Sequence, residues 1–150
     1  MNHLMYAVLA GCGAAVAIGL LSFMDANLAD VALLMAPFGA TTVLVFGLPD
    51  SPLAQPKNVI FGHLLTAAIG VFFTQYVGVS AMTLAIATGA GVSAMLMTKT
   101  THPPAGANPI LIMLSGQSWG FLFTPVLVGA VMIVVVGRCM KLLQQRFIAA

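Results

Sequence analysis

The chain has 150 residues, of which 61% are hydrophobic and 5% are charged; its mean hydropathy is +1.09 and its formal net charge is +2. Soluble domains carry about 25% charged residues, so five basic and three acidic side chains cannot coat a soluble globule of this length. These values exclude a soluble enzyme, a disordered tail, a collagen and a nucleic-acid-binding protein, and they predict an integral membrane protein with a single domain over residues 1–150.

Six apolar segments follow one another along the chain. They are Leu4–Met24, Val31–Leu48, Val59–Val77, Ala81–Met97, Pro104–Leu114 and Phe121–Leu143. The second and fifth are short or interrupted by Pro and Gly, and the fifth cannot span a bilayer as a straight helix. Strands of a membrane barrel alternate apolar and polar residues, whereas these runs are uniformly apolar. The sequence therefore predicts an all-α, polytopic transmembrane bundle.

The few charges indicate an orientation. If all six segments cross and the N-terminus is cytoplasmic, every Lys and Arg lies at the cytoplasmic face, while Asp25 and Asp30 lie outside. Re-entrant hairpins in place of the two short segments would move Lys57 and Lys99 to the outer face. Because cytoplasmic loops are enriched in Lys and Arg, we expect six passes with cytoplasmic N- and C-termini.

Small residues recur at four-residue spacing in three segments, a pattern that lets helix backbones approach closely. We expect these ridges to be packing faces of a tight bundle. They are Gly11, Ala15 and Gly19; Gly62, Thr66, Gly70 and Thr74; and Ala81, Ala85, Gly89 and Ser93. Cys12 and Cys139 lie inside apolar runs, so we expect small core residues and neither a disulfide nor a metal site.

The two short segments share a Pro-x-Gly-Ala-polar pattern. The stretch from Pro37 to Thr41 aligns with the stretch from Pro104 to Asn108, and an aliphatic run follows each. The chain then divides into halves of three segments, about 1–78 and 79–150. An odd number of crossings per half predicts a 3+3 inverted repeat, and matched Gly/Pro interruptions indicate a transporter binding site near the bilayer midplane.

Backbone chemistry indicates what such a site would bind. Pro disfavours helix at the residue before it, so each Pro-x-Gly-Ala stretch is expected to be non-helical, with a short helix just after it capped by Thr41 or Asn108. Helix N-termini from both halves would then favour a small anion at mid-membrane. The alternative is a pair of structural kinks packed against neighbouring helices. The candidate residues from the two stretches are Gly39, Ala40, Thr41, Pro103, Pro104, Gly106, Ala107 and Asn108.

Two histidines join the candidate binding residues. His102 is expected just inside the cytoplasmic face, where a neutral imidazole could donate a hydrogen bond to an anion and a protonated one could couple transport to pH. The alternative is an interfacial His bonded to a loop carbonyl. His63, in the third segment, either faces the same cavity or only packs in the first turns of its helix. We find no Walker loop, GxSxG motif or metal-ligand spacing, so we expect neither enzyme activity, nor a bound metal, nor a cofactor.

Two stretches of sequence together resemble the HPP family of integral membrane proteins, named for its His-Pro-Pro motif. The first runs from Phe38 through the long Ser-Pro-Leu-Ala-Gln-Pro-Lys sequence to His63, and the second is His102 to Ala107. The resemblance implies a small helical bundle, usually described as four membrane helices, in bacteria or chloroplast envelopes, where members are associated with nitrite transport. It places the chain in a bacterial inner membrane. The family usually has Thr where this sequence has Asn108.

Together these expectations favour a transporter or channel for a small monovalent anion, nitrite first. The absence of an acid within the segments favours a channel-like or His-coupled path over a sodium symporter. Two alternatives stay open: a pore for water or another neutral solute, and a membrane scaffold that transports nothing. The expected partners are a small inorganic anion and the lipid bilayer, with self-association possible and no nucleic acid.

Overall fold

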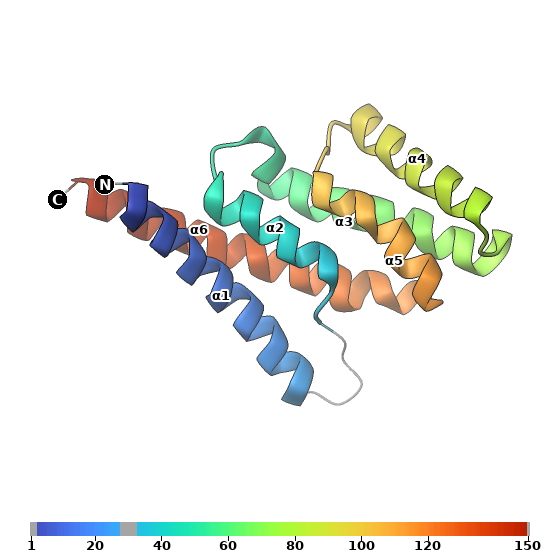
Figure 1. The fold of residues 1–150 in the computed structure, drawn as a ribbon, viewed down its shortest axis with the longest axis horizontal. Coiled ribbons are helices and arrows are strands. Elements are labelled where there is room, and N and C mark those ends of the chain that lie inside the picture. Colours follow the sequence, from blue (N-terminus) through green and yellow to red (C-terminus); the bar gives the residue numbers. More distant parts are fainter. Residues whose placement is uncertain (1–2, 28–32, 150) are drawn as a thin grey trace.

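The computed structural model describes residues 3–27 and 33–149, with side chains as far as Gln145 (Figure 1). Every regular element in these ranges is helical. The α-helices are α1 (His3–Asn27), α2 (Ala36–Gly47), α3 (Pro56–Phe72), α4 (Ala81–Thr98), α5 (Asn108–Ser115) and α6 (Val128–Ala149). A π-turn extends α3 to Val77, and short turns precede α6 from Trp119 onward. The predicted all-α fold is confirmed.

Four helical stretches in the described ranges are long and apolar enough to cross a membrane: His3–Asn27, Pro56–Val77, Ala81–Thr98 and Trp119–Gln145. Helix α2 has 12 residues and α5 has 8. At 1.5 Å per residue they are about 18 and 12 Å long, shorter than a hydrocarbon core of about 30 Å. In Figure 1, α1, α3 and α5 nevertheless run one way and α2, α4 and α6 the other way, as six alternating segments require.

The cationic residues gather at one end of the bundle. Lys141 of α6 forms an ion pair with Asp50 in the loop after α2 (2.6 Å). The side-chain amide of Asn58, beside Lys57, donates to the carbonyl of Thr101, next to the loop that carries Lys99. This grouping agrees with the expected topology, whereas the side of the membrane that it faces stays a prediction.

Aromatic residues mark the opposite end. The indole Nε1 of Trp119 donates to the hydroxyl of Tyr76 (3.3 Å), and the amide of Gln75 donates to the carbonyl of Gln117 nearby. Trp and Tyr are enriched where helices leave the hydrocarbon core. This pair therefore identifies a second membrane interface, at the far ends of α3 and of the turns that lead into α6.

Cysteine labelling tests this arrangement. In a chain with both native cysteines replaced by Ser, we expect Lys57→Cys and Lys99→Cys to react with an impermeant thiol reagent from one side of the membrane. Val79→Cys, in the turn between α3 and α4, should react from the other side. Labelling of Lys57→Cys and Lys99→Cys from opposite sides would contradict a fold in which the start of α3 and the connection between α4 and α5 lie at the same end of the bundle.

Helix α6 approaches α2 closely because glycines face bulky side chains. A Cβ added at Gly129 would lie 2.1 Å from the Phe38 ring, and one at Gly137 would lie 2.3 Å from Val45. Phe38 is fully buried, so its ring fills the space that the missing side chain leaves. The core therefore runs along the α2–α6 contact, where Pro37, Phe38 and their neighbours are held.

The expected packing ridges are only partly correct. The α3 ridge packs as expected, since Gly62 lies against Thr100 and His102 and Gly70 lies against Pro109. The ridges of α1 and α4 are exposed instead, and the residues that α1 buries are Gly13, Ala17 and Leu21. Four-residue spacing marks more than one face of a helix, so it does not by itself select the buried one. Cys12 and Cys139 are also exposed, which corrects their assignment to the core.

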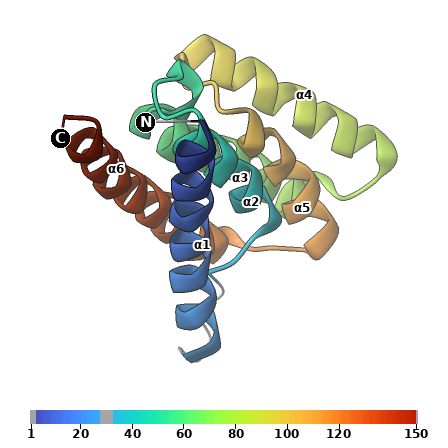
Figure 2. The same cartoon turned by 60° about the vertical axis from the view of Figure 1, so that its left-hand side comes forward.

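The helix contacts of the two halves correspond. Helix α1 packs on α2 and α6, and α4 packs on α5 and α3; likewise α2 packs on α6, and α5 packs on α3. Figures 1 and 2 show α2 and α5 between the flanking helices α1 and α4. Exchange of the two halves turns each of these contacts into another, as a repeat requires. The inverted relation of the halves, about 1–78 and 79–150, stays a prediction.

Candidate functional site

The first Pro-x-Gly-Ala stretch is helical, which corrects the expected break. Met35 has extended backbone (φ −139°, ψ 147°) and α2 begins at Ala36, so Pro37 lies in the first turn. A proline there sacrifices a backbone N–H that would have no partner within the helix, and its fixed φ suits the helix. The proline therefore starts the helix before the Pro-x-Gly-Ala stretch and does not interrupt it.

The second stretch is closer to the expectation. Residues Pro103–Ala107 form a 3-10 turn, η3, and the short helix α5 starts directly after it. Neither Thr41 nor Asn108 caps a helix, however. The N-cap positions belong to Met35 and Ala107, and the two polar side chains point into the bundle. There each finds partners on another helix, which a capping side chain could not reach.

The two stretches meet through five polar side chains that are each 0% exposed. We call this group the polar cluster; its members are Thr41, His63, Thr66, His102 and Asn108. They come from α2, α3, the residue that precedes η3, and α5, and so from both halves of the chain. Polar side chains within a membrane bundle are costly unless they are hydrogen-bonded, and they commonly mark functional sites. For His63, the sequence left open whether it faces a cavity or only packs in the first turns of its helix; in the structure its side chain is fully buried and belongs to this cluster.

Thr41 bridges the two imidazoles. Its Oγ1 lies 2.8 Å from Nε2 of His63, 3.0 Å from Nε2 of His102 and 3.1 Å from the carbonyl oxygen of Pro37. The imidazole rings are 5.0 Å apart, edge to face, and the Phe38 ring packs edge-on against His63 at 5.3 Å. The hydroxyl therefore holds α2 to both α3 and η3 at one point.

The partners of Asn108 fix the tautomer of His63. The Asn108 Nδ2 lies 3.0 Å from each of three atoms: the carbonyl oxygen of His63, Oγ1 of Thr66 and Nδ1 of His63. A carbonyl only accepts hydrogen bonds, so the amide must present its amino group on this side. Nδ1 of His63 then accepts, and its Nε2–H donates to Thr41. The other amide atom, Oδ1, is buried without a hydrogen-bond partner among the described residues.

The carbonyl of Leu53 fixes the tautomer of His102 in the same way. His102 Nδ1 lies 2.8 Å from this oxygen and must donate to it. In a neutral ring Nε2 then accepts the hydroxyl hydrogen of Thr41. The result is one directed chain of hydrogen bonds that runs from Asn108 through His63, Thr41 and His102 to Leu53, with both imidazoles neutral.

The environment of His102 keeps it neutral at neutral pH. Burial lowers the pKa of its imidazole from the ordinary value of 6.5, while the hydrogen bond to Leu53 acts in the opposite direction and is the smaller influence. The folded state therefore binds this proton less readily than the unfolded chain does. By linkage, His102 supports the fold above its unfolded pKa, and this support is lost as pH falls through the folded pKa.

The remaining candidate residues lie outside the polar cluster, and all of them except the buried Pro104 are at least partly exposed. Between α2 and η3–α5 runs a groove of about 620 Å³, which we call the proline groove. It is lined by Ala36, Pro37, Ala40, Pro103, Pro104, Ala107, Ile110, Leu111, Leu114 and Ser115. Its walls are almost wholly apolar. Gly39 is exposed and Gly106 is half-buried, and a side chain at either would meet open space within the described structure.

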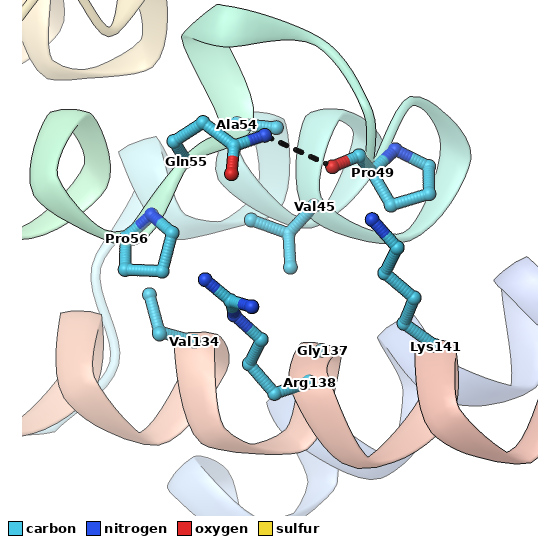
Figure 3. A pocket seen from close by; sticks show the side chains of 9 residues that line it. All are labelled: Val45, Pro49, Ala54, Gln55, Pro56, Val134, Gly137, Arg138 and Lys141. Atoms are coloured by element: carbon cyan, nitrogen blue, oxygen red, sulfur yellow. Dashed lines mark hydrogen bonds between the residues drawn. The ribbon is translucent and has the colours of Figure 1, made fainter.

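A second, smaller cavity lies at the cationic end. It has a volume of about 30 Å³, enough for about one water molecule. Figure 3 shows Arg138 and Lys141 of α6 reaching across it toward the loop that holds Pro49, Gln55 and Pro56. The Gln55 amide donates to the Pro49 carbonyl and so holds this loop over α6. Positive side chains therefore line the loop side of the bundle.

Sequence reasoning missed three partners in the polar cluster. Thr66 was expected only as part of a packing ridge, although its position three residues after His63 puts both side chains on one helix face. The carbonyls of Leu53 and Pro37 carry no side-chain signal at all. Among the described residues, no group of three or more His, Cys, Asp or Glu could hold a metal ion.

Comparison with known proteins identifies the family. The protein-family model described as the HPP transmembrane region matches residues 1–147 of the sequence. Two transmembrane proteins of Dictyostelium discoideum are similar to this chain. One is 38% identical over 121 residues, which cover 75% of this chain and 42% of the relative. The other is 39% identical over 105 residues, which cover 65% of this chain and 34% of the relative.

The chain thus spans about two fifths or less of the length of these relatives. No solved structure matches it. The family match covers all of α1 to α5, all but the last two residues of α6, and both halves of the polar cluster. Its description as a transmembrane region agrees with the four membrane-spanning stretches of the structure. The chain belongs to the HPP family of transmembrane proteins.

Proposed function

We propose that this protein is a transporter or channel for a small monovalent anion, with nitrite the first candidate. The observation that carries the proposal is the polar cluster, five buried polar side chains that join both halves of an otherwise apolar bundle. The cluster ties the N-terminal part of each short helix to α3, so movement of α2 or α5 would open or close it. Structural kinks alone would not need such a network, because apolar side chains would pack there at lower cost.

Two features favour a negative solute. The first turn of α2 and the start of α5 both border the proline groove, at Pro37 and at Ala107, and helix N-termini are electropositive. The positive side chains of Arg138 and Lys141 lie at one end of the bundle, where they would raise the local anion concentration. The proposed binding residues are those predicted from the sequence, with the polar cluster as the gate and the groove as the approach.

A neutral-solute pore is the second candidate, because the polar cluster contains no fixed charge and the groove is apolar. Oδ1 of Asn108, which has no hydrogen-bond partner in the described part of the chain, is an acceptor, and this suits water or another hydrogen-bond donor better than an anion. The scaffold reading is less favoured, since Gly39 and Gly106 lie beside open space and are not packed. Self-association and the bacterial inner membrane remain predictions.

Flux through proteoliposomes tests the proposal. We expect nitrite to enter vesicles that contain the wild-type protein faster than empty vesicles. His102→Ala and Asn108→Ala should reduce this rate about tenfold or more, since each leaves buried partners unpaired at a cost of about 1–3 kcal/mol. Equal rates in empty and loaded vesicles would contradict the proposal. Fast osmotic swelling without nitrite entry would favour the neutral-solute pore.

A further inference from the structure

The hydrogen bonds around His102 leave room for one additional proton. If Nε2 of His102 is protonated, it donates to Thr41 Oγ1 across the same 3.0 Å contact. The Thr41 hydroxyl hydrogen then turns to the carbonyl oxygen of Pro37, 3.1 Å away on its own helix. The oxygen of Thr41 accepts from both histidines, which its two lone pairs allow. Every group keeps a partner, and only one hydroxyl rotates.

His63 has no such freedom. A proton on its Nδ1 would face the amino group of Asn108 at 3.0 Å, donor against donor. Rotation of the amide would relieve this contact, but it would place Oδ1 against the carbonyl oxygen of His63, acceptor against acceptor. Protonation of His63 therefore breaks the polar cluster, whereas protonation of His102 leaves it intact. The two neighbouring histidines are chemically distinct.

Within the described residues, no acidic side chain lies against His102 to balance a charge on it. The elements packed against η3 are α2, α3, α4 and α5. Of these, α2, α4 and α5 contain no Asp, Glu, Lys, Arg or His, and α3 contributes His63, which contacts the ring, and the exposed Lys57. The turn of Leu53 adds a carbonyl alone. Of the two described acids, Asp50 pairs with Lys141, and Asp25 accepts from the backbone of Leu33.

An uncompensated buried charge costs several kcal/mol. A proton on His102 and a small anion beside it would cancel each other's charge, and either one alone would not be balanced. We propose that His102 binds one proton together with the anion. Rotation of the Thr41 hydroxyl allows the proton to bind, and the protein therefore moves protons and small anions in equal numbers. This inference rests on the proposed function and adds its energy coupling.

The lowered proton affinity of His102 in the anion-free state fits this scheme. Burial holds its pKa below the ordinary value, so the empty site is neutral near pH 7. An anion nearby would raise the affinity for the proton, and by reciprocity the proton would raise the affinity for the anion by the same factor. An inward proton gradient would then drive anion uptake.

Nitrogen NMR of the wild-type protein in nanodiscs, labelled with ¹⁵N-histidine, tests the inference, with variants used only to assign the signals. We expect His63 to remain the Nε2–H tautomer as pH falls, while His102 gains its second proton first. Added nitrite should raise the proton affinity of His102 about tenfold, within the usual range of coupling between sites. Assignment uses His102→Gln and His63→Gln, and the exposed His3 serves as the internal control for an imidazole outside the polar cluster.

Flux measurements distinguish a failure of the proton coupling from a failure of the proposed anion transport. Nitrite entry that is accelerated by an inward proton gradient and carries no net current supports the inference. Nitrite entry that carries current and ignores the proton gradient overturns the inference and leaves the proposed function standing. No nitrite entry at any pH overturns the proposed function and, with it, the coupling. A second proton that appears on His63 before His102 overturns the inference whatever the flux shows.

Discussion

Thr41→Val is expected to destabilise the protein by about 2 kcal/mol or more and to abolish solute flux. Valine keeps the shape of threonine and removes the hydroxyl that joins His63 to His102. The donor Nε2–H of one ring and the acceptor Nε2 of the other then lose their partner, and each buried polar group left unsatisfied costs about 1–3 kcal/mol. Thermal unfolding of the detergent-solubilised protein, followed by circular dichroism, measures the loss.

The neighbouring residue provides a matched control. Thr42 is also nearly buried, and its hydroxyl donates to the carbonyl of Gly39 within the same helix. Thr42→Val removes one local hydrogen bond and orphans no side chain on another helix, so we expect a change within about 1 kcal/mol. If the two variants unfold at the same temperature, the bridge between the histidines contributes nothing and our description of the polar cluster is wrong.

Gly129→Ala is the second change with a large expected effect. The added methyl group would lie 2.1 Å from the Phe38 ring, which is fully buried and packs against His63. Overpacking of this kind costs about 1–3 kcal/mol. Because the Phe38 ring packs edge-on against His63, we also expect the histidine NMR signals of the polar cluster to shift.

Gly19→Ala is the control for this change. Gly19 lies on the exposed face of α1, and a Cβ there meets no other atom of the described chain within 4 Å. Alanine favours helix over glycine by about 0.5–1 kcal/mol, so this variant should be neutral or slightly stabilised. Equal losses for both variants would show that α6 does not approach α2 as closely as the structure has it.

Much of the architecture could be predicted from the sequence because a bilayer allows few alternatives. Uniformly apolar runs exclude a soluble fold and a barrel, and the position of Lys57, Lys99 and Lys141 at one end follows from the alternation of segments. The match between Pro37–Thr41 and Pro104–Asn108 correctly indicated that the two stretches meet.

The details of the site could not be predicted for physical reasons. Proline both ends and begins helices, and the sequence does not say which; here Pro37 begins α2. Asn108 is a good capping residue by type, but its side chain gains more from His63 and Thr66 on another helix than from its own backbone. The carbonyls that fix both histidine tautomers come from Leu53 and from His63 itself. Every residue has a backbone carbonyl, so the sequence cannot indicate which of them accepts such a hydrogen bond.

The prediction that the small-residue ridges of α1 and α4 are buried was wrong for a related reason. In α1, the small residues at Gly11, Ala15 and Gly19 and those at Gly13 and Ala17 offer two smooth faces to a neighbour. Which of them is buried depends on where the Phe46 ring projects, since it fills the space above Gly13. Such complementarity lies between two helices and is not a property of either one alone.

The most direct test of the central claim is nitrite entry into proteoliposomes containing wild-type protein, Thr41→Val or Thr42→Val, reconstituted in equal amounts. Our account expects entry with the wild type and Thr42→Val, and a rate close to that of empty vesicles with Thr41→Val. Undiminished entry with folded Thr41→Val would show that the solute does not depend on the buried contact between the two halves of the chain, and would contradict the account.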